Sequence, residues 1–501
     1  MKRILLVLPD ESIKRLLWND PRVVVLDECG WWIADWIGES RRLVETFSFT
    51  VDWTMPTDIA ATIGRLKRWN PIWSRWVADA DQYELLYRDS LFYVRHLQSG
   101  MRQLGITRVL MVTGISHHVM TSLIELAAAE LGIEQAFLYF NLISGRLQPF
   151  FQLCGVQDRT ASRAVVSDYD ASEDIARFKH RSARRKRPKL PYFIGRQSEW
   201  YLYGVLNAAY VRMRQTAARV KRGPSVGDAR FHDHFAALRL TDYWRILRQQ
   251  REALHYLDAQ TQGRRVEDYC RPNAGRALMI AAHYQPEATS FPEGGDLWNH
   301  VDIVIRLRQM GWSGPILYRE HFASRYYQLP RVHQTLIGIA RSKSYYQQLL
   351  ALGCVLVEYQ QPLTAKAALA DAIIPVTISG TIAVERALEG LPTIVSGYPW
   401  YQGMPGIRSM ATAPADSPLA SIGHAPDAAL AADAAVFLNQ QLSKVTILNA
   451  PGLGTAQPLS DNESEAAFRA EFSLFTQFLI EAGPVVSQRR ESLSAQSRGV
   501  E

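Results

Sequence analysis

Three stretches of this chain place polar side chains directly after an apolar run. The runs are "ALMIAA", "PILYR" and "AIIPVTI", and each is short and aliphatic, as expected for a buried β-strand. The polar residues that follow are His283, Gln285 and Glu287, then Glu320 and His321, then Ser379, Gly380 and Thr381. In open parallel sheets, ligands bind outside the carboxyl ends of the strands. The three stretches are therefore predicted to line one ligand-binding edge.

The third stretch has the residues of a phosphate-binding turn. Ser379, Gly380 and Thr381 separate the strand from a helical run that ends at Gly390. Backbone N–H groups at such a turn and the helix dipole favour an anion, and a glycine lets the backbone approach it closely. The two hydroxyl groups add donors, unless Thr381 only caps the helix. Glu385 is either a ligand for ribose hydroxyl groups or an ordinary exposed helix carboxylate.

The other two stretches offer groups for acid, base or leaving-group chemistry. His321 is the candidate to donate a hydrogen bond to a phosphate or a leaving oxygen, with a structural histidine as the alternative. Glu320 could share the catalytic role, or it could pair with Arg319 and take no part in chemistry. Gln285 and Glu287 follow the same logic, although loops before prolines are often merely polar.

Two series of alternating strands and helices are predicted to position these residues. "ITRVLMVTG", "VMTSLIELAAAELG" and "EQAFLYF" read as strand, helix and strand, and five further apolar runs alternate with helical segments after Arg276. This pattern predicts two doubly wound α/β domains. The expected boundaries are 1–190 for the first domain, 191–265 for a helical connecting region, 266–410 for the second domain, 411–483 for an extension with a closing helix, and 484–501 for a disordered tail.

Composition narrows the class of protein and of partner. The 501 residues carry a net charge of +7, which favours anionic partners. The four cysteines form no CxxC pair, so neither a disulfide framework nor a zinc site is expected. "MKRILLVLP" is too short for a signal peptide and reads as a first strand. No apolar run is long enough to span a bilayer, so we expect a cytoplasmic or peripheral protein.

A basic run, "RFKHRSARRKRPK" at 177–189, has no hydrophobic stripe and predicts a solvated linker or loop. Attraction to anionic lipid or to an acidic acceptor is the alternative. The run lacks interleaved aromatic residues, so a nucleic-acid partner is not expected. Walker A, GxGxxG and GxSxG motifs are absent, and "DYD" at 168–170 lies in a polar stretch that we do not assign to a metal.

Together the stretches resemble the capsule polysaccharide synthesis family, which includes retaining transferases of 3-deoxy-D-manno-oct-2-ulosonic acid (Kdo). "HYQPEATSFPEGG", "ILYREHF" and "ISGTIAVERALEGLPTIVSGYPWY" are similar, in this order, to a Gln-Pro loop, a Lys-Glu-His-Pro-like strand end and a Ser/Thr-Gly-Thr segment of that family. "FLYFNLISGRLQPFFQLCGVQ" resembles a further family segment. The likeness covers 276–401 and, more weakly, 106–160. It implies a GT-B-like fold, in which two Rossmann-like domains face a central cleft.

The resemblance also implies roles for individual residues. Ser379 to Thr381 would hold the donor's phosphate, Glu385 its ribose, and His321 would neutralise charge on the departing nucleotide. The residues assigned to catalysis are His321, Glu287 and Glu320, and those assigned to donor binding are His283, Gln285, Ser379, Gly380, Thr381 and Glu385. No metal is assigned, because GT-B enzymes usually stabilise the leaving phosphate with a helix N-terminus and basic side chains.

The sequence departs from the family at two positions. Phe322 stands where the family usually has proline, and Gln148 stands where it tends to carry an acidic residue near a proline. These departures leave the donor, the stereochemical outcome and the activity itself open.

The predicted function is a glycosyltransferase that moves a sugar, which could be Kdo-like, from a nucleotide donor to a capsule or other surface-polysaccharide acceptor. The donor could be CMP-linked, and no separate cofactor is expected. The acceptor would dock on the first domain. The alternatives are a GT-B enzyme that uses a UDP- or GDP-sugar, including an epimerase, and a non-catalytic GT-B-fold protein of polysaccharide assembly or export. The expected location is the cytoplasm, with peripheral contact to an anionic inner membrane or glycolipid acceptor favoured by the positive charge.

Overall fold

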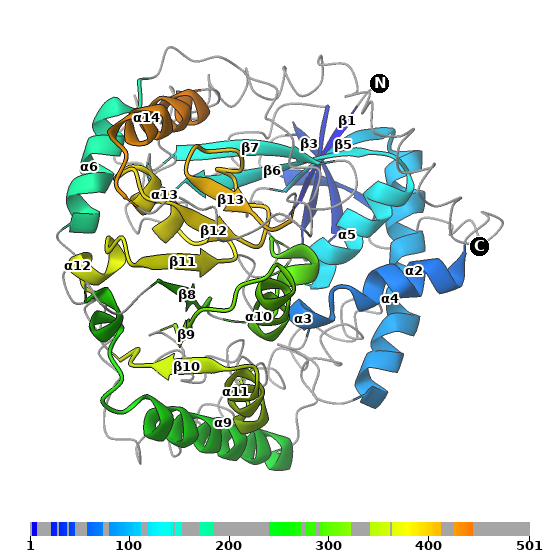
Figure 1. Ribbon diagram of the computed structural model, residues 1–501. Coiled ribbons are helices and arrows are strands. Elements are labelled where there is room, and N and C mark those ends of the chain that lie inside the picture. The colour runs from blue at the N-terminus through cyan, green and yellow to red at the C-terminus, as the bar shows by residue number, and fades with distance from the viewer. Residues whose placement is uncertain are drawn as a thin grey trace, which may run out of the picture.

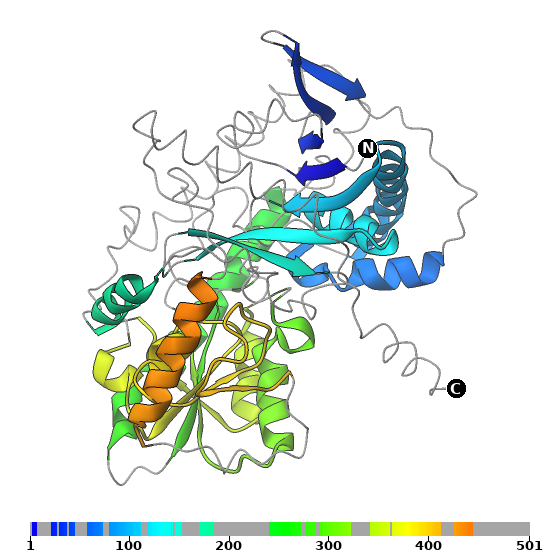
Figure 2. The same ribbon diagram turned by 90° about the horizontal axis from the view of Figure 1, so that it is seen from above.

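The chain forms two α/β units, each built on its own β-sheet (Figure 1). This computed structural model describes residues 3–7, 22–27, 30–37, 40–45, 58–73, 80–111, 119–141, 143, 146–152, 170–183, 240–271, 276–283, 285, 291, 293–321, 341–360, 363–411 and 425–443. Figure 2 shows the two sheets in different parts of the molecule. The α/β class and the two doubly wound units predicted from the sequence are confirmed.

The first sheet has seven strands in the order β4-β3-β2-β1-β5-β6-β7. Its parallel centre consists of β1 (Arg3–Val7), β2 (Val23–Asp27), β5 (Ile106–Met111) and β6 (Glu134–Asn141). The sequence predicts all four, with β2 indicated by the β-branched run "RVVVLDE". The antiparallel strands at its two sides are β3 (Gly30–Ile37), β4 (Ser40–Glu45) and β7 (Arg146–Gln152). These three were not predicted, and β7 contains Pro149, which an edge strand tolerates because one side of it forms no ladder.

Helices pack against the first sheet and close its core. They are α2 (Ile59–Lys67), α3 (Asn70–Trp73), α4 (Ala80–Gln103) and α5 (Val119–Glu130). Leu5, Val109 and Leu123 belong to one buried cluster with Trp73 from α3 and Leu97 from α4. The predicted helix that stops at Gly132 is α5, and this glycine has a φ of 67°. A left-handed residue of this kind ends a helix without steric cost when it is glycine.

The second sheet has six parallel strands in the order β10-β9-β8-β11-β12-β13. The strands are β8 (Ala277–Ala281), β9 (Ile316–Arg319), β10 (Cys354–Val357), β11 (Ile373–Thr377), β12 (Thr393–Val395) and β13 (Ile407–Ser409). Numbered from β8, this is the order 3-2-1-4-5-6 of the Rossmann fold. The chain reverses its direction of travel across the sheet between β8 and β11, so the topological switch point lies between these two strands.

Both faces of the second sheet are buried. Leu278 and Ile280 of β8 pack in a cluster with Tyr346, whereas Ala277 and Met279 pack in a second cluster on the other face. Successive residues of a strand point to opposite faces, so a strand covered on both sides must be apolar throughout. The covering helices are α9 (Leu240–Thr261), α10 (His300–Gln309), α11 (Lys343–Ala351), α12 (Ala365–Ala368) and α13 (Ile382–Ala387).

The basic run at 177–189 is not wholly a linker, which corrects the prediction. Its first part belongs to α6 (Ser172–Ala183), and 184–189 lie outside the described residues. Ile175 is buried in a cluster with Leu438 of α14 (Ala428–Ser443), and Phe178 packs against the same cluster. Figure 2 shows α6 beside α14. The helical periodicity of α6 was not predicted, because only two large apolar residues, Ile175 and Phe178, lie among its polar and charged ones.

Two other predicted segments are partly seen. Within the region 191–265, the described helix α9 packs against β10 and α11 of the second unit. Within 411–483, α14 packs against α13 and α6, whereas the predicted closing helix and the tail after residue 483 lie outside the described residues. Among the helices that the structure describes, none combines the length and the apolar character needed to cross a membrane.

Candidate functional site

The candidate site lies at the carboxyl edge of the second sheet, where β8 and β11 end side by side. The two strands pair in parallel, with Ile280 opposite Val376. From there the chain runs through α10 to β9 on one side and through α13 to β12 on the other. A crevice between diverging connections is where ligands of this fold bind.

His283 and Thr377 join the two strand ends. The Nε2 atom of His283 lies 2.9 Å from the Thr377 hydroxyl oxygen and accepts a hydrogen bond from the Ser379 N–H at 3.3 Å. An atom that accepts from a backbone N–H carries no proton, so the imidazole proton is on Nδ1. Burial, together with the nearby His321 and Arg341, lowers the pKa of His283 to about 3. His283 is therefore neutral at physiological pH.

The turn at Ser379 and Gly380 is held from inside the protein, which corrects the prediction that its N–H groups stand free for a phosphate. The Ser379 N–H is bonded to His283, and the Gly380 N–H donates to the Thr377 hydroxyl at 3.1 Å. A Cβ atom on Gly380 would lie 2.6 Å from that hydroxyl oxygen. The contact with Thr377 therefore requires glycine at this position, a reason that the sequence did not predict.

Thr381 and Glu385 remain the candidate ligand-binding residues on this side of the switch point. Thr381 occupies the position before α13, yet its side chain makes no capping hydrogen bond. Thr381 and Glu385 are both half-buried, and Ser379 retains 9% of its accessible surface. The structure thus does not support the alternative in which Thr381 only caps the helix.

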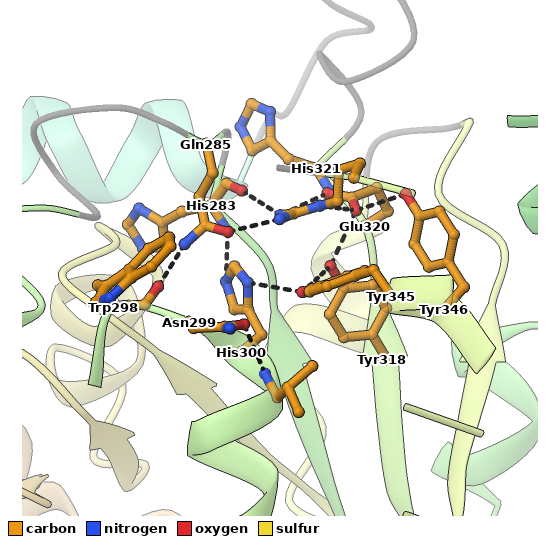
Figure 3. A network of polar contacts seen from close by, with 12 residues as sticks. His283, Gln285, Trp298, Asn299, His300, Tyr318, Glu320, His321, Tyr345 and Tyr346 are labelled. Carbon is orange, nitrogen blue, oxygen red and sulfur yellow. Dashed lines mark hydrogen bonds and ion pairs between the residues drawn. The ribbon is translucent and has the colours of Figure 1, made fainter. Parts of the chain in front are cut away.

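On the other side of the switch point, one buried arginine connects the loops that follow β8 and β9. Figure 3 labels its partners His283, Gln285 and Glu320. Arg341 donates from Nε to Glu320 Oε2 at 2.6 Å, from Nη1 to Gln285 Oε1 at 2.5 Å, and from Nη2 to the His283 carbonyl oxygen at 2.9 Å. It also lies over the ring of Tyr345, 4.7 Å from the centroid. Sequence reasoning missed Arg341, because it follows none of the runs assigned to strands and lies 21 positions beyond Glu320 in the chain.

Glu320 is fully buried and its oxygens are occupied. Besides Arg341, the hydroxyl groups of Tyr318 and Tyr346 donate to Oε2 at 2.9 and 3.0 Å, and the His321 N–H donates to Oε1 at 2.7 Å. Burial alone would raise the pKa of Glu320, but the Arg341 charge and these hydrogen bonds hold it below its usual value. Both oxygens of Glu320 are therefore engaged within the protein, and Arg341 is its ion-pair partner.

A second histidine extends this network beneath the site. His300, at the start of α10, accepts the His283 N–H at Nε2 at 3.1 Å, and its Nδ1 lies 3.2 Å from the Tyr345 hydroxyl oxygen. Burial lowers the pKa of His300 well below its usual value, with Arg341 and the other histidines adding to the effect. No sequence pattern pointed to His300, because it follows a loop and not a strand.

His321 and Gln285 have different surroundings. His321 is half-buried, and burial, together with Arg319 and Arg341, lowers its pKa to about 4 although Glu320 acts in the opposite direction. A neutral His321 can donate a hydrogen bond to a phosphate, but it brings no positive charge of its own. The Gln285 side chain bonds to Arg341 and to the Trp298 carbonyl oxygen, so its amide holds the loop rather than facing a pocket.

The remaining candidates cannot be placed. Glu287 and Phe322 lie outside the described residues, and the side chain of Gln148, in β7, is not described either. Among the residues that the structure does describe, no group of three or more His, Cys, Asp or Glu side chains is arranged to hold a metal ion.

Comparisons with known proteins add little to this site. No family model matches the sequence, and no curated protein matches it. Among solved structures, the UDP-GlcNAc 2-epimerase from Methanocaldococcus jannaschii is similar at 10% sequence identity, over 95% of this chain and 99% of that chain, with a TM-score of 0.20. A TM-score this low has no weight for fold or function, and the fold class rests on the strand order.

Proposed function

We propose that the protein is an enzyme that processes nucleotide sugars, and specifically a glycosyltransferase that binds its donor at the carboxyl edge of the second sheet. The observation that carries this proposal is the meeting of polar side chains at the switch point of a sheet with the Rossmann strand order. Such edges bind nucleotides in α/β proteins generally. Transfer to a surface polysaccharide, a Kdo-like sugar and a CMP leaving group rest on the sequence resemblance alone.

The proposed donor contacts come from two sides of the switch point. Thr381, whose hydroxyl does not cap α13, would donate to the donor's phosphate, and Glu385 would accept from the ribose hydroxyl groups. From the β9 side, His321 would donate to a phosphate oxygen. An anion next to His321 would raise the pKa of that imidazole, so donor binding and proton uptake would be coupled. A group from the first unit would activate the acceptor.

Binding of nucleotides tests the first part of the proposal. CMP, UDP and GDP, each with its sugar conjugates, would be compared for their effect on thermal unfolding. A ligand at 100 times its dissociation constant stabilises a protein by about 2.7 kcal/mol. We expect one nucleotide to raise the melting temperature, and we expect Thr381→Val and Glu385→Gln to remove most of this rise.

Two matched variants control for general damage. Thr107→Val removes an exposed hydroxyl from the first unit, and Glu389→Gln changes an exposed carboxylate just beyond α13. Both should keep the nucleotide response of the wild type. If no nucleotide stabilises the protein, or if the control variants lose the response equally, the proposed donor site is wrong.

Turnover separates the enzyme from its non-catalytic alternative. Both oxygens of Glu320 are occupied by hydrogen bonds within the protein, which removes one predicted catalytic group and so favours the non-catalytic alternative. The stabilising sugar nucleotide would be incubated with the protein, and nucleotide release would be measured with and without glycan acceptors. Release that depends on an acceptor indicates transfer, whereas binding without release indicates an assembly protein that retains the fold.

A further inference from the structure

Arg341 has an unusual set of partners. It precedes Ser342, whose hydroxyl caps α11 by accepting the Tyr345 N–H at 3.1 Å. Only 5% of Arg341 is exposed, yet its three side-chain nitrogens bond to three different residues. These partners come from the ends of β8 and β9, so one guanidinium connects the start of α11 to two strand-end loops.

We propose that Arg341 is a positioning residue of the donor site, which fixes the two loops relative to each other and to the switch point. The inference rests on the proposed function for the identity of the ligand. The arrangement itself is independent of that identity.

The first connection leads to His321. Arg341 holds the Glu320 carboxylate through Nε at 2.6 Å, and the other oxygen of this carboxylate accepts the His321 N–H at 2.7 Å. The backbone that carries His321 is thereby tied to Arg341 through a single carboxylate. Movement of Glu320 would move His321, which is partly open to solvent, whereas the other histidines described at this edge, His283 and His300, are buried.

The second connection leads to the turn before α13. Arg341 Nη2 donates to the His283 carbonyl oxygen at 2.9 Å, and the ring of His283 accepts the Ser379 N–H. Arg341 Nη1 also donates to the side-chain oxygen Oε1 of Gln285 at 2.5 Å, which fixes the same loop two residues further on. Both sides of the proposed donor site therefore depend on the position of one side chain.

The geometry requires arginine and not simply a positive charge. A guanidinium is planar and presents its donors in fixed directions, whereas a lysine ammonium is one point charge on a flexible stem. A lysine at 341 could pair with Glu320 but could not also reach Gln285 and the His283 carbonyl oxygen from the same plane. The ring of Tyr345, 4.7 Å away, further restricts the guanidinium.

The test compares Arg341→Lys with Arg308→Lys. Arg308 is a matched control, because its guanidinium also bonds to backbone oxygens, those of Trp312 and Gly314 at 2.9 Å, but before β9 and away from the carboxyl edge. The probe is whichever of CMP, UDP and GDP stabilises the wild type. We expect Arg341→Lys to raise its dissociation constant at least tenfold, and Arg308→Lys to change it less than twofold at a similar loss of melting temperature.

A second readout needs no ligand. The charged groups that act on His321 are Glu320, Arg319 and Arg341. Arg341→Lys keeps a positive charge but loses the fork of donors that holds Glu320, so if this fork positions His321 the imidazole becomes less buried. Its pKa should then rise, because burial is the main cause that lowers it, and NMR titration of labelled histidine can follow the change. An Arg341 that acts only through its charge or through overall stability predicts no such rise in Arg341→Lys.

The outcomes separate this inference from the proposed function. A tenfold loss of affinity in Arg341→Lys together with a raised His321 pKa in the same variant supports the positioning role. Wild-type affinity in Arg341→Lys, or a loss equal to that in Arg308→Lys, overturns it. If the wild type binds none of the three nucleotides, the proposed function fails, and the His321 titration alone decides: a raised pKa supports the positioning role and an unchanged pKa overturns it.

Discussion

The Nε2 atom of His283 lies 2.9 Å from the hydroxyl oxygen of Thr377, a residue 94 positions later in the chain. This contact joins the ends of β8 and β11 across the switch point of the second sheet. Because the same Nε2 atom also accepts the Ser379 N–H, the neutral imidazole sets the conformation of the turn before α13. The strand ends predicted from the sequence thus lie side by side, but their polar groups form hydrogen bonds with one another.

Gly380 is the residue most sensitive to this close approach. In Gly380→Ala the new Cβ would stand 2.6 Å from the Thr377 hydroxyl oxygen, so one of the two must move. Overpacking of this kind costs about 1–3 kcal/mol of unfolding free energy. Urea unfolding would measure the loss. Adding Thr377→Ala removes the oxygen, so the double variant should lose less than the sum of the two single variants.

A second glycine provides the control for this substitution. Gly64 lies in α2, and a Cβ there would meet no atom within 4 Å. Gly64→Ala should leave stability unchanged or raise it by up to about 1 kcal/mol, because alanine favours a helix. Equal stability of Gly380→Ala and the wild type would contradict the packing described for the turn.

Glu320 should behave as part of the folded core. In Glu320→Gln the Arg341 charge loses its buried counter-ion, which costs about 3–5 kcal/mol where the remaining charge stays buried. Asp268→Asn removes one partner of the exposed pair with Arg271 and should cost no more than about 1 kcal/mol. A Glu320→Gln protein that is as stable as the wild type but inactive would return Glu320 to its predicted catalytic role.

The sequence predicted the strand ends but not the partners of their side chains. For Glu320, pairing with its neighbour Arg319 was the alternative to a catalytic role. Successive residues of an extended chain point in opposite directions, so Glu320 shares a face with Tyr318, which donates to it at 2.9 Å. The true ion-pair partner, Arg341, lies 21 positions away, beyond the reach of any local pattern.

Element boundaries were easiest to predict where one residue type determines them. Gly132 and Gly390 were expected to end helices, and both have a left-handed φ, of 67° and 72°. The fold class followed from alternating apolar runs, since both faces of β8 and β11 are buried. The hairpin β3–β4 and the edge strand β7 escaped prediction because antiparallel additions to a parallel sheet need no characteristic spacing from it.

The packing of α6 on the second unit gives a further prediction. Ile175 is buried in the cluster that includes Ala383 of α13 and Leu438 of α14. Ile175→Ala should lower the unfolding free energy by about 2–5 kcal/mol, as for other buried aliphatic truncations. Ile59, on α2, is 59% exposed and serves as the control, and Ile59→Ala should cost less than about 0.5 kcal/mol. Equal losses in the two variants would contradict the packing of α6.

Stability should fall as the pH drops below 6.5, because the buried histidines remain neutral in the folded protein while they take up protons in the unfolded chain. Burial is the main cause in each case, and it lowers the pKa to about 3 for His283 and about 4 for His321. A depressed histidine pKa has no effect above 6.5, where both states are neutral. Below that, each such histidine costs about 1.4 kcal/mol per pH unit until the folded-state pKa is reached.

By pH 5 the loss should therefore be on the order of 2 kcal/mol for each of these two residues. Urea unfolding at pH 7.5, 6.5, 5.8 and 5.0 would measure it, in a range above the usual pKa of most carboxylates. His321→Gln removes the half-buried imidazole and keeps the fold, so the loss of unfolding free energy between pH 6.5 and 5.0 should be smaller by about the amount expected for one histidine. An unfolding free energy that stays constant from pH 7.5 to 5.0 would mean that these imidazoles are not held neutral, and with it the hydrogen bond from Ser379 to His283 would be excluded.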